Sequence, residues 1–256
     1  LCKTKKSFMF RRKKYGRCTY GQKEYYEVRK YELPFNSPEE ALHKYFSEGL
    51  LPALNRNGIQ NIGVFEALGS PIPKQIFLFI PYNDLKHHAE VTQALEKDKN
   101  YLSERKLYDA IPENKKVYNR FTVSFFIAFD SLPRLIKPKE DSQLFEYRIY
   151  EGYSEDAVKR KVDMFNEEEL KIFKNTGLHS VFFGEQISGP SMPSLAYMLA
   201  FKSMEERNIN WEKFSKDPDW KRISSLKKYS NTVSDIKRIF LKPLKYSALW
   251  NIELKI

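Results

Sequence analysis

Cysteine is almost absent from this 256-residue chain, since only Cys2 and Cys18 occur and both lie near the N-terminal end. The rest of the chain therefore has no thiol for a disulfide, a metal site or nucleophilic catalysis. Long apolar runs are missing too, because no stretch approaches the roughly 18 residues that a membrane-spanning helix needs. We expect a soluble protein without a membrane span, located in the cytoplasm or exported.

Catalytic signatures are missing as well. The sequence contains no glycine-rich phosphate loop, no nucleophile elbow and no zinc-ligand spacing. It therefore favours a protein that is not an enzyme, and it predicts no metal site and no cofactor.

Acidic residues are missing from the N-terminal end, although the whole chain carries a net charge of +11. Residues 1–23 contain nine Lys or Arg and no Asp or Glu, and residues 221–256 contain nine basic and two acidic residues. The long segment between them is therefore net acidic. A domain that reads nucleic acid usually carries its basic stripe on the folded body, so we predict no specific nucleic-acid binding.

The N-terminal segment, residues 1–23, is expected to be a disordered basic arm. It begins with Leu, and no apolar stretch follows Arg11-Arg12, so no export signal is visible. The alternative is an arm that binds acidic partners through its charge.

The body of the chain contains an internal repeat with an offset of 119 residues. Several separated matches share this offset, which argues for two copies of one module. They are Tyr26–Tyr31 with Phe145–Tyr150, Gly58 with Gly177, Glu66 with Glu185, and Tyr101 with Trp220.

Both copies predict the same order of elements, β-α-β-β-α-β. In the first copy we expect strands at 25–33, 60–68, 75–81 and 120–130, with helices from Pro38 to Gly58 and over 84–103. In the second we expect strands at 145–150, 179–187, 195–202 and 234–250, with helices from Ser154 to Gly177 and over 203–216. This order is the split βαβ, or ferredoxin-like, arrangement of the α+β class. The expected domains are 24–130 and 144–250, joined by a linker at 131–143.

The first strand of the second copy has two different faces. Phe145, Tyr147 and Ile149 form an apolar face, which we expect the helices to cover. The opposite face carries Glu146, Arg148 and Tyr150, and the first copy repeats this set as Glu27, Arg29 and Tyr31. Two such sheets packed face to face would close a barrel-like core with these polar residues inside.

Two interpretations of the polar face compete. It is a structural network of satisfied charge pairs, or it is a ligand pocket in which Arg148 binds an anion and Glu146 acts as a base. The structural network is the preferred interpretation. His179, which opens a strand, and Trp220, which follows a helix end, are further candidate ligand-binding residues.

The second copy resembles the NIPSNAP family of the dimeric α/β-barrel superfamily. The resemblance covers about residues 144–247. It is carried by Phe145-Glu146-Tyr147-Arg148-Ile149-Tyr150, by Gly177 to Gly184, by Pro193 to Phe201, and by Trp211-Glu212-Lys213-Phe214 with Asp217-Pro218-Asp219-Trp220. The first copy is similar to a divergent member, because it has Asp98-Lys99-Asn100-Tyr101 in place of the D-P-x-W element.

The resemblance implies a ferredoxin-like barrel half that is normally completed by dimerisation. A tandem pair would complete it within one chain, and self-association of chains is the alternative. The family implies no settled activity, so we expect a module that binds a small molecule or another protein. The alternative is an enzyme of the superfamily, resembling its cofactor-free monooxygenases or its haem enzymes, with His179 as the one tempting haem ligand.

Overall fold

The computed structural model describes residues 22–69 and 71–250 of the chain. The basic arm expected at residues 1–23 therefore lies almost entirely outside the described residues.

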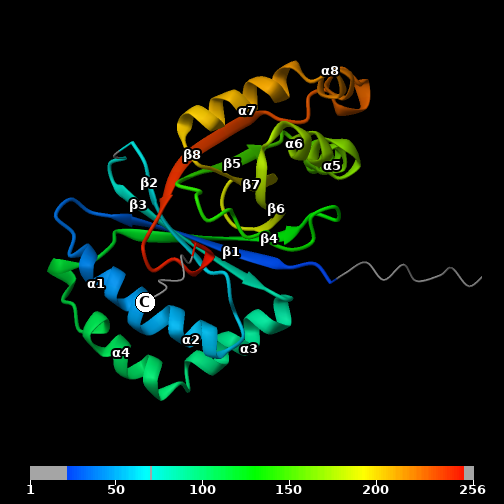
Figure 1. The fold of residues 1–256 in the computed structure, drawn as a ribbon. Helices are drawn as coiled ribbons and strands as arrows, with labels where there is room; N and C mark the ends of the chain where they lie inside the picture. The colour runs from blue at the N-terminus through cyan, green and yellow to red at the C-terminus, as the bar shows by residue number, and fades with distance from the viewer. Residues whose placement is uncertain (1–21, 70, 251–256) are drawn as a thin grey trace, which may run out of the picture.

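The first module follows the expected order of strands and helices (Figure 1). Its elements are β1 (Tyr25–Leu33), α1 (Glu39–Lys44), η1 (Tyr45–Leu50), α2 (Leu51–Arg56), β2 (Gly63–Ala67), β3 (Lys74–Tyr82), α3 (Leu85–Leu95), α4 (Lys99–Asp109), η2 (Glu113–Lys115) and β4 (Arg120–Ala128).

The second module repeats this order. Its elements are β5 (Leu144–Glu151), α5 (Glu155–Met164), η3 (Phe165–Glu169), α6 (Leu170–Thr176), β6 (His179–Ser188), β7 (Ser194–Phe201), α7 (Met204–Lys216), α8 (Pro218–Ser224), η4 (Lys227–Tyr229), β8 (Asp235–Pro243) and η5 (Ala248–Trp250). The first helix of both modules contains a π-helical segment, η1 or η3.

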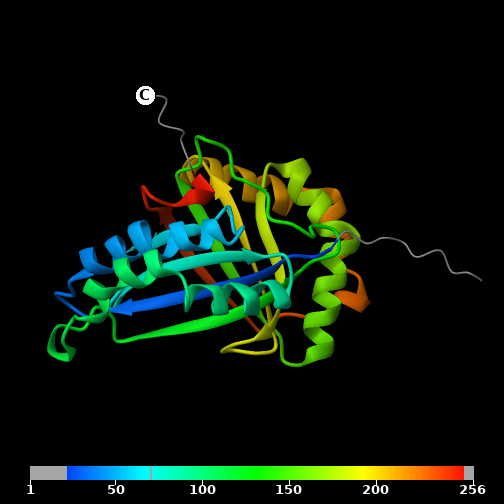
Figure 2. The same cartoon turned by 90° about the horizontal axis from the view of Figure 1, so that it is seen from below.

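The strands of both modules form one closed antiparallel barrel in the order β1-β3-β2-β8-β5-β7-β6-β4. Each module contributes four consecutive strands, and two joints connect the modules, β2 with β8 and β4 with β6. The predicted fold class is therefore confirmed, and the barrel is completed within one chain. Helices α1 to α4 lie outside one side of the barrel and α5 to α8 outside the other (Figures 1 and 2).

Two predicted element boundaries were wrong. The helix predicted over 84–103 is two helices, because the Asp98 carboxylate accepts a hydrogen bond from the Tyr101 N–H and caps a new helix there. Asp217, 119 residues later, begins α8 in the same way. The strand predicted to reach residue 250 ends at Pro243, and the chain then folds back so that the Leu249 N–H donates to the Ile62 carbonyl.

The assignment of the two faces of β5 was also wrong. Phe145 and Tyr147 point into the barrel, where they pack among buried aromatic and aliphatic side chains from both modules. Glu146, Arg148 and Tyr150 lie on the outer face, under the helices. The physical reason is that the helix layer supplies polar partners for these residues, whereas the barrel interior is apolar and aromatic. Glu27, Arg29 and Tyr31 in β1 likewise face their own helices.

No helix within the described part of the chain is long and apolar enough to cross a membrane.

Candidate functional site

A buried polar network lies between the sheet and the helices of the second module. At its centre, the fully buried Glu146 of β5 accepts hydrogen bonds from the Nε of Arg148 (2.8 Å), from the Nε and Nη2 of Arg207 on α7 (both 2.9 Å) and from the indole N–H of Trp211 (2.8 Å). The Arg148 guanidinium also stacks over the Trp211 ring at 3.8 Å from its centroid. Burial acts to raise the pKa of Glu146, but these donors and the charge of Arg148 outweigh it and hold that pKa below its ordinary value.

The network continues along the sheet through two tyrosines. Arg148 Nη1 donates a long hydrogen bond of 3.3 Å to the Tyr150 hydroxyl, which in turn lies 2.7 Å from the hydroxyl of Tyr197 on β7. Burial raises the pKa of Tyr197 well above its ordinary value, so its hydroxyl stays protonated. Either hydroxyl can be the donor in this hydrogen bond.

A second buried ion pair lies next to the tyrosines. Lys161 of α5 donates to Glu169 of η3 at 2.6 Å, and both side chains are almost completely buried. Aromatic rings surround the ammonium group, with the centroid of Phe165 at 4.5 Å and those of Trp220 and Tyr150 at 5.4 and 5.9 Å. Burial raises the pKa of Glu169, although the charge of Lys161 opposes this shift.

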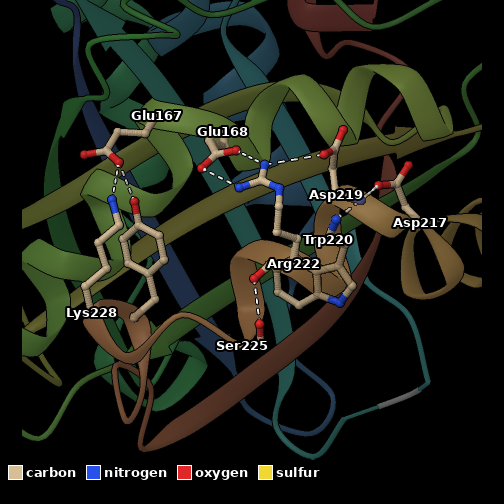
Figure 3. A network of polar contacts seen from close by, with 9 residues as sticks. Glu167, Glu168, Asp217, Asp219, Trp220, Arg222, Ser225 and Lys228 are labelled. Carbon is tan, nitrogen blue, oxygen red and sulfur yellow. Dashed lines mark hydrogen bonds and ion pairs between the residues drawn. The ribbon is translucent and has the colours of Figure 1, made fainter.

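The segment from α8 to η4, residues 218–229, covers the second ion pair from outside, and we call it the cap. Figure 3 shows how two neighbouring glutamates of η3 hold it. Glu167 accepts from Lys228 and Tyr229, and Glu168 accepts from Arg222. Three consecutive glutamates thus have different roles, because Glu169 alone turns inward to Lys161.

The first module has a smaller version of this network. Arg29 donates to the buried Glu27 at 2.5 Å, Tyr82 donates to the same carboxylate at 3.0 Å, and His88 lies 3.6 Å from it. His88 occupies the repeat position of Arg207. The second ion pair has no counterpart, since Leu42 and Leu50 stand at the repeat positions of Lys161 and Glu169, and both are buried.

The predicted site residues thus fall in three places. Glu146, Arg148 and Tyr150 are brought together, with Trp220 close to Lys161. Their counterparts Glu27, Arg29 and Tyr31 lie under the helices of the other module. His179 lies apart from both networks, with its Nε2 at 2.9 Å from Lys139 Nζ and 3.9 Å from Glu206. Nothing in the structure tests the alternative, drawn from the resemblance, that His179 is a haem ligand.

Sequence reasoning missed five members of the network, namely Lys161, Glu169, Tyr197, Arg207 and Trp211. A signal for two of them was available in the repeat. Positions 42 and 50 are leucines on the apolar face of a helix, and the same offset puts a lysine and a glutamate at the equivalent buried positions of the second copy.

Comparisons with known proteins agree with this architecture. Residues 145–248 match the NIPSNAP family model, so the second module is a NIPSNAP domain. No match was found among curated proteins.

Among solved structures, two candidate monooxygenases share the fold over most of the chain. The protein of Lactobacillus acidophilus NCFM is 12% identical with a TM-score of 0.57, and the alignment covers 86% of this chain and 94% of that one. The protein of Fusobacterium nucleatum subsp. nucleatum is 13% identical with a TM-score of 0.55, covering 88% and 94%. A mutant chlorite dismutase of Candidatus Nitrospira defluvii is 5% identical with a TM-score of 0.50, covering 89% and 94%. At these identities the likeness establishes the fold alone.

Proposed function

We propose that the NIPSNAP domain of this chain binds a small carboxylate-bearing molecule between its sheet and its helices, and that the first module serves mainly to complete the barrel. The ligand would lie near Arg148, Tyr150, Tyr197 and Lys161, beneath the cap.

The difference between the modules at Lys161 and Glu169 carries this proposal. A buried ion pair contributes little net stability, because removing two charges from water costs about as much as their attraction returns. The first module folds with Leu42 and Leu50 at the same two positions, both buried in its apolar core. The fold therefore does not require the pair, and a role in binding explains why one module has it.

The charge of the network supports an anionic ligand. Four cations share the two buried carboxylates Glu146 and Glu169. They are Arg148, Lys161, Arg207 and the half-exposed Arg238, whose Nε lies 3.4 Å from Glu146. Within the described residues, Arg148 Nη1 donates only the long hydrogen bond to Tyr150. A carboxylate would balance the excess charge and accept a shorter bond from this group. The surrounding aromatic rings favour a ligand with a planar apolar part.

The test uses benzoate as the probe, its neutral isostere benzamide for comparison, and isothermal titration calorimetry as the measurement. We expect the full chain to bind benzoate and to bind benzamide at least about tenfold more weakly, since the amide lacks the charge that Arg148 recognises.

The matched variant copies the first module by replacing Lys161→Leu together with Glu169→Leu. It should lose benzoate binding and unfold at the same or a higher denaturant concentration than the original chain. The control, Lys44→Gln with Glu48→Gln, removes an exposed pair from the equivalent helix of the first module and should keep binding. Failure of the original chain to bind benzoate, or unchanged binding by the leucine variant, would refute the proposal. A large loss of stability in the leucine variant would assign the pair to folding instead.

A further inference from the structure

Two large apolar side chains project into solvent at one end of the first module. Phe35, in the loop after β1, is 93% exposed, and Ile72, in the turn between β2 and β3, is 96% exposed. They lie close together, because both line the same hollow of about 290 Å³. Adjacent apolar residues on loop tips mark a surface that contacts something other than water. We call this surface the first tip.

The charged residues around the first tip are mainly basic. Lys115, Lys116 and Arg120 are exposed, and no carboxylate within the described residues lies within ion-pair distance of them. Lys74, by contrast, is neutralised by Glu39 and Glu66. Among the described residues, the three unpaired cations therefore outnumber the two unpaired acids of this region, Glu40 and Glu113.

The geometry places the cations beside the apolar residues. A second hollow, of about 780 Å³, lies between the loop of Phe35 and the turn that carries Lys115 and Lys116. Figure 2 shows the end of β1 (blue) and the turn after α4 (green) at the same end of the molecule. Protruding apolar side chains with lysines set back beside them suit a bilayer surface, since the apolar groups enter the acyl region while the lysines meet the phosphates.

The second module has a similar tip with the opposite charge. Tyr153 and Met192 are exposed at the corresponding loop and turn, at 66% and 50%. The acids Glu155 and Asp235 are exposed beside them and have no ion-pair partner among the described residues, whereas Asp156 is paired with Arg160 and Lys237 is paired with Glu151. Exposure of apolar residues at this end is thus common to both modules, whereas three cations without an ion-pair partner among the described residues distinguish the first.

We propose that the first tip docks the protein on an anionic membrane surface, with Phe35 and Ile72 inserted and Lys115, Lys116 and Arg120 facing the headgroups. A protruding apolar pair favours a lipid surface over a peptide, which would be held inside a groove rather than on two projecting side chains.

The test measures co-sedimentation of the full chain with vesicles of phosphatidylserine and phosphatidylcholine, and with vesicles of phosphatidylcholine alone. We expect binding to the anionic vesicles that weakens as salt is raised. Phe35→Ser with Ile72→Ser should weaken it on the order of 100-fold, because two apolar side chains no longer leave water. Tyr153→Ser with Met192→Ser is the matched control and should bind as the original chain does.

The basic ends of the chain are present in every variant, so the difference between variants reports the tip alone. Equal binding by the Phe35/Ile72 variant and the original chain, or no binding by either, would overturn the proposal. A decrease in oligomer size in the Phe35/Ile72 variant, measured by light scattering, would instead show that the tip contacts a second copy. Both side chains are exposed, so thermal unfolding followed by circular dichroism should be unchanged and confirms that the variant is folded.

Discussion

Glu146 is a carboxylate without access to water whose charge is fully matched by protein donors. Its two oxygens accept four hydrogen bonds, from Arg148, Arg207 and Trp211. An amide at this position would donate as well as accept, and it would leave the guanidinium groups of Arg148, Arg207 and Arg238 without this counter-charge. The counterpart Glu27 is as deeply buried, but its partner Arg29 remains 21% exposed and can be hydrated. The two modules therefore carry a buried glutamate at the same repeat position, and they differ in how far water can reach its arginine partner.

We predict that Glu146→Gln lowers the free energy of unfolding by about 3–5 kcal/mol at neutral pH, because it leaves buried charge unpaired. Glu27→Gln should cost only about 1–3 kcal/mol, since water can solvate Arg29. Urea unfolding followed by tryptophan fluorescence measures both values. Equal losses in the two variants would contradict the role of solvent exposure.

The pH dependence of the Glu146 effect has a definite sign. The folded-state pKa of Glu146 is lowered, so its contribution is present above the unfolded pKa of about 4.3. The contribution is lost as the pH falls through the lower, folded value. The difference in stability between the original chain and Glu146→Gln should therefore shrink in acid. Glu169 titrates in both proteins, with its pKa raised, and cancels in this difference.

At the scale of elements, the cap is attached to the rest of the module by charged groups at its surface. Lys228 and Arg222 reach back to Glu167 and Glu168 of η3, and Arg160 of α5 donates to the carbonyl oxygens of Lys228 and Ser230. Exposed pairs of this kind contribute little each, and the buried Ile223 and Tyr229 add apolar packing to the core of the module. We expect the cap to open more easily when its ion pairs are removed. Its opening would expose the region around Lys161.

We predict that Glu167→Gln with Glu168→Gln speeds amide hydrogen exchange within residues 218–229 and changes global stability by less than about 2 kcal/mol. Exchange measured by mass spectrometry resolves this segment. Glu212→Gln, which removes the exposed pair with Lys216 on α7, is the control and should leave exchange in the cap unchanged. Unaltered exchange in the double variant would show that apolar packing of Trp220 and Ile223 holds the cap.

Sequence periodicity predicted the order of elements well because the signals are local. Pro38 and Ser154 mark helix starts, and Gly177 marks the end of α6, where it has a φ of +80°. The faces of β5 could not be predicted, because both are buried and alternation only separates two sets of residues. Which set meets helices depends on donors that come from distant segments, such as Arg207 and Trp211. For the same reason the network beyond Glu146, Arg148 and Tyr150 was not predicted.

At the scale of the whole molecule, the two joints remove every open sheet edge from the barrel. Strand β2 of the first module pairs with β8 of the second, and β4 pairs with β6. These two pairings replace the contacts between subunits that a dimeric barrel would use. The barrel interior is filled by aromatic side chains from both modules, including Phe65 against Phe145 at 4.8 Å between ring centroids. The chain thus needs no second copy to bury its sheets.

We predict that the full chain is a monomer in dilute solution, because its strand edges and its barrel core are already satisfied. Light scattering coupled to size exclusion, at moderate salt and without lipid, measures the mass. A stable dimer of the original chain would contradict this and would direct attention to surfaces outside the barrel.

The covalent link between the modules also affects how the protein can change over generations. In a homodimer one set of codons encodes both halves, so every substitution is made twice and both halves change together. Here each half has its own codons, and the barrel requires only that the joints and the aromatic core still fit. One half is therefore free to carry leucines where the other carries a charged pair, which is the difference seen between Leu42/Leu50 and Lys161/Glu169.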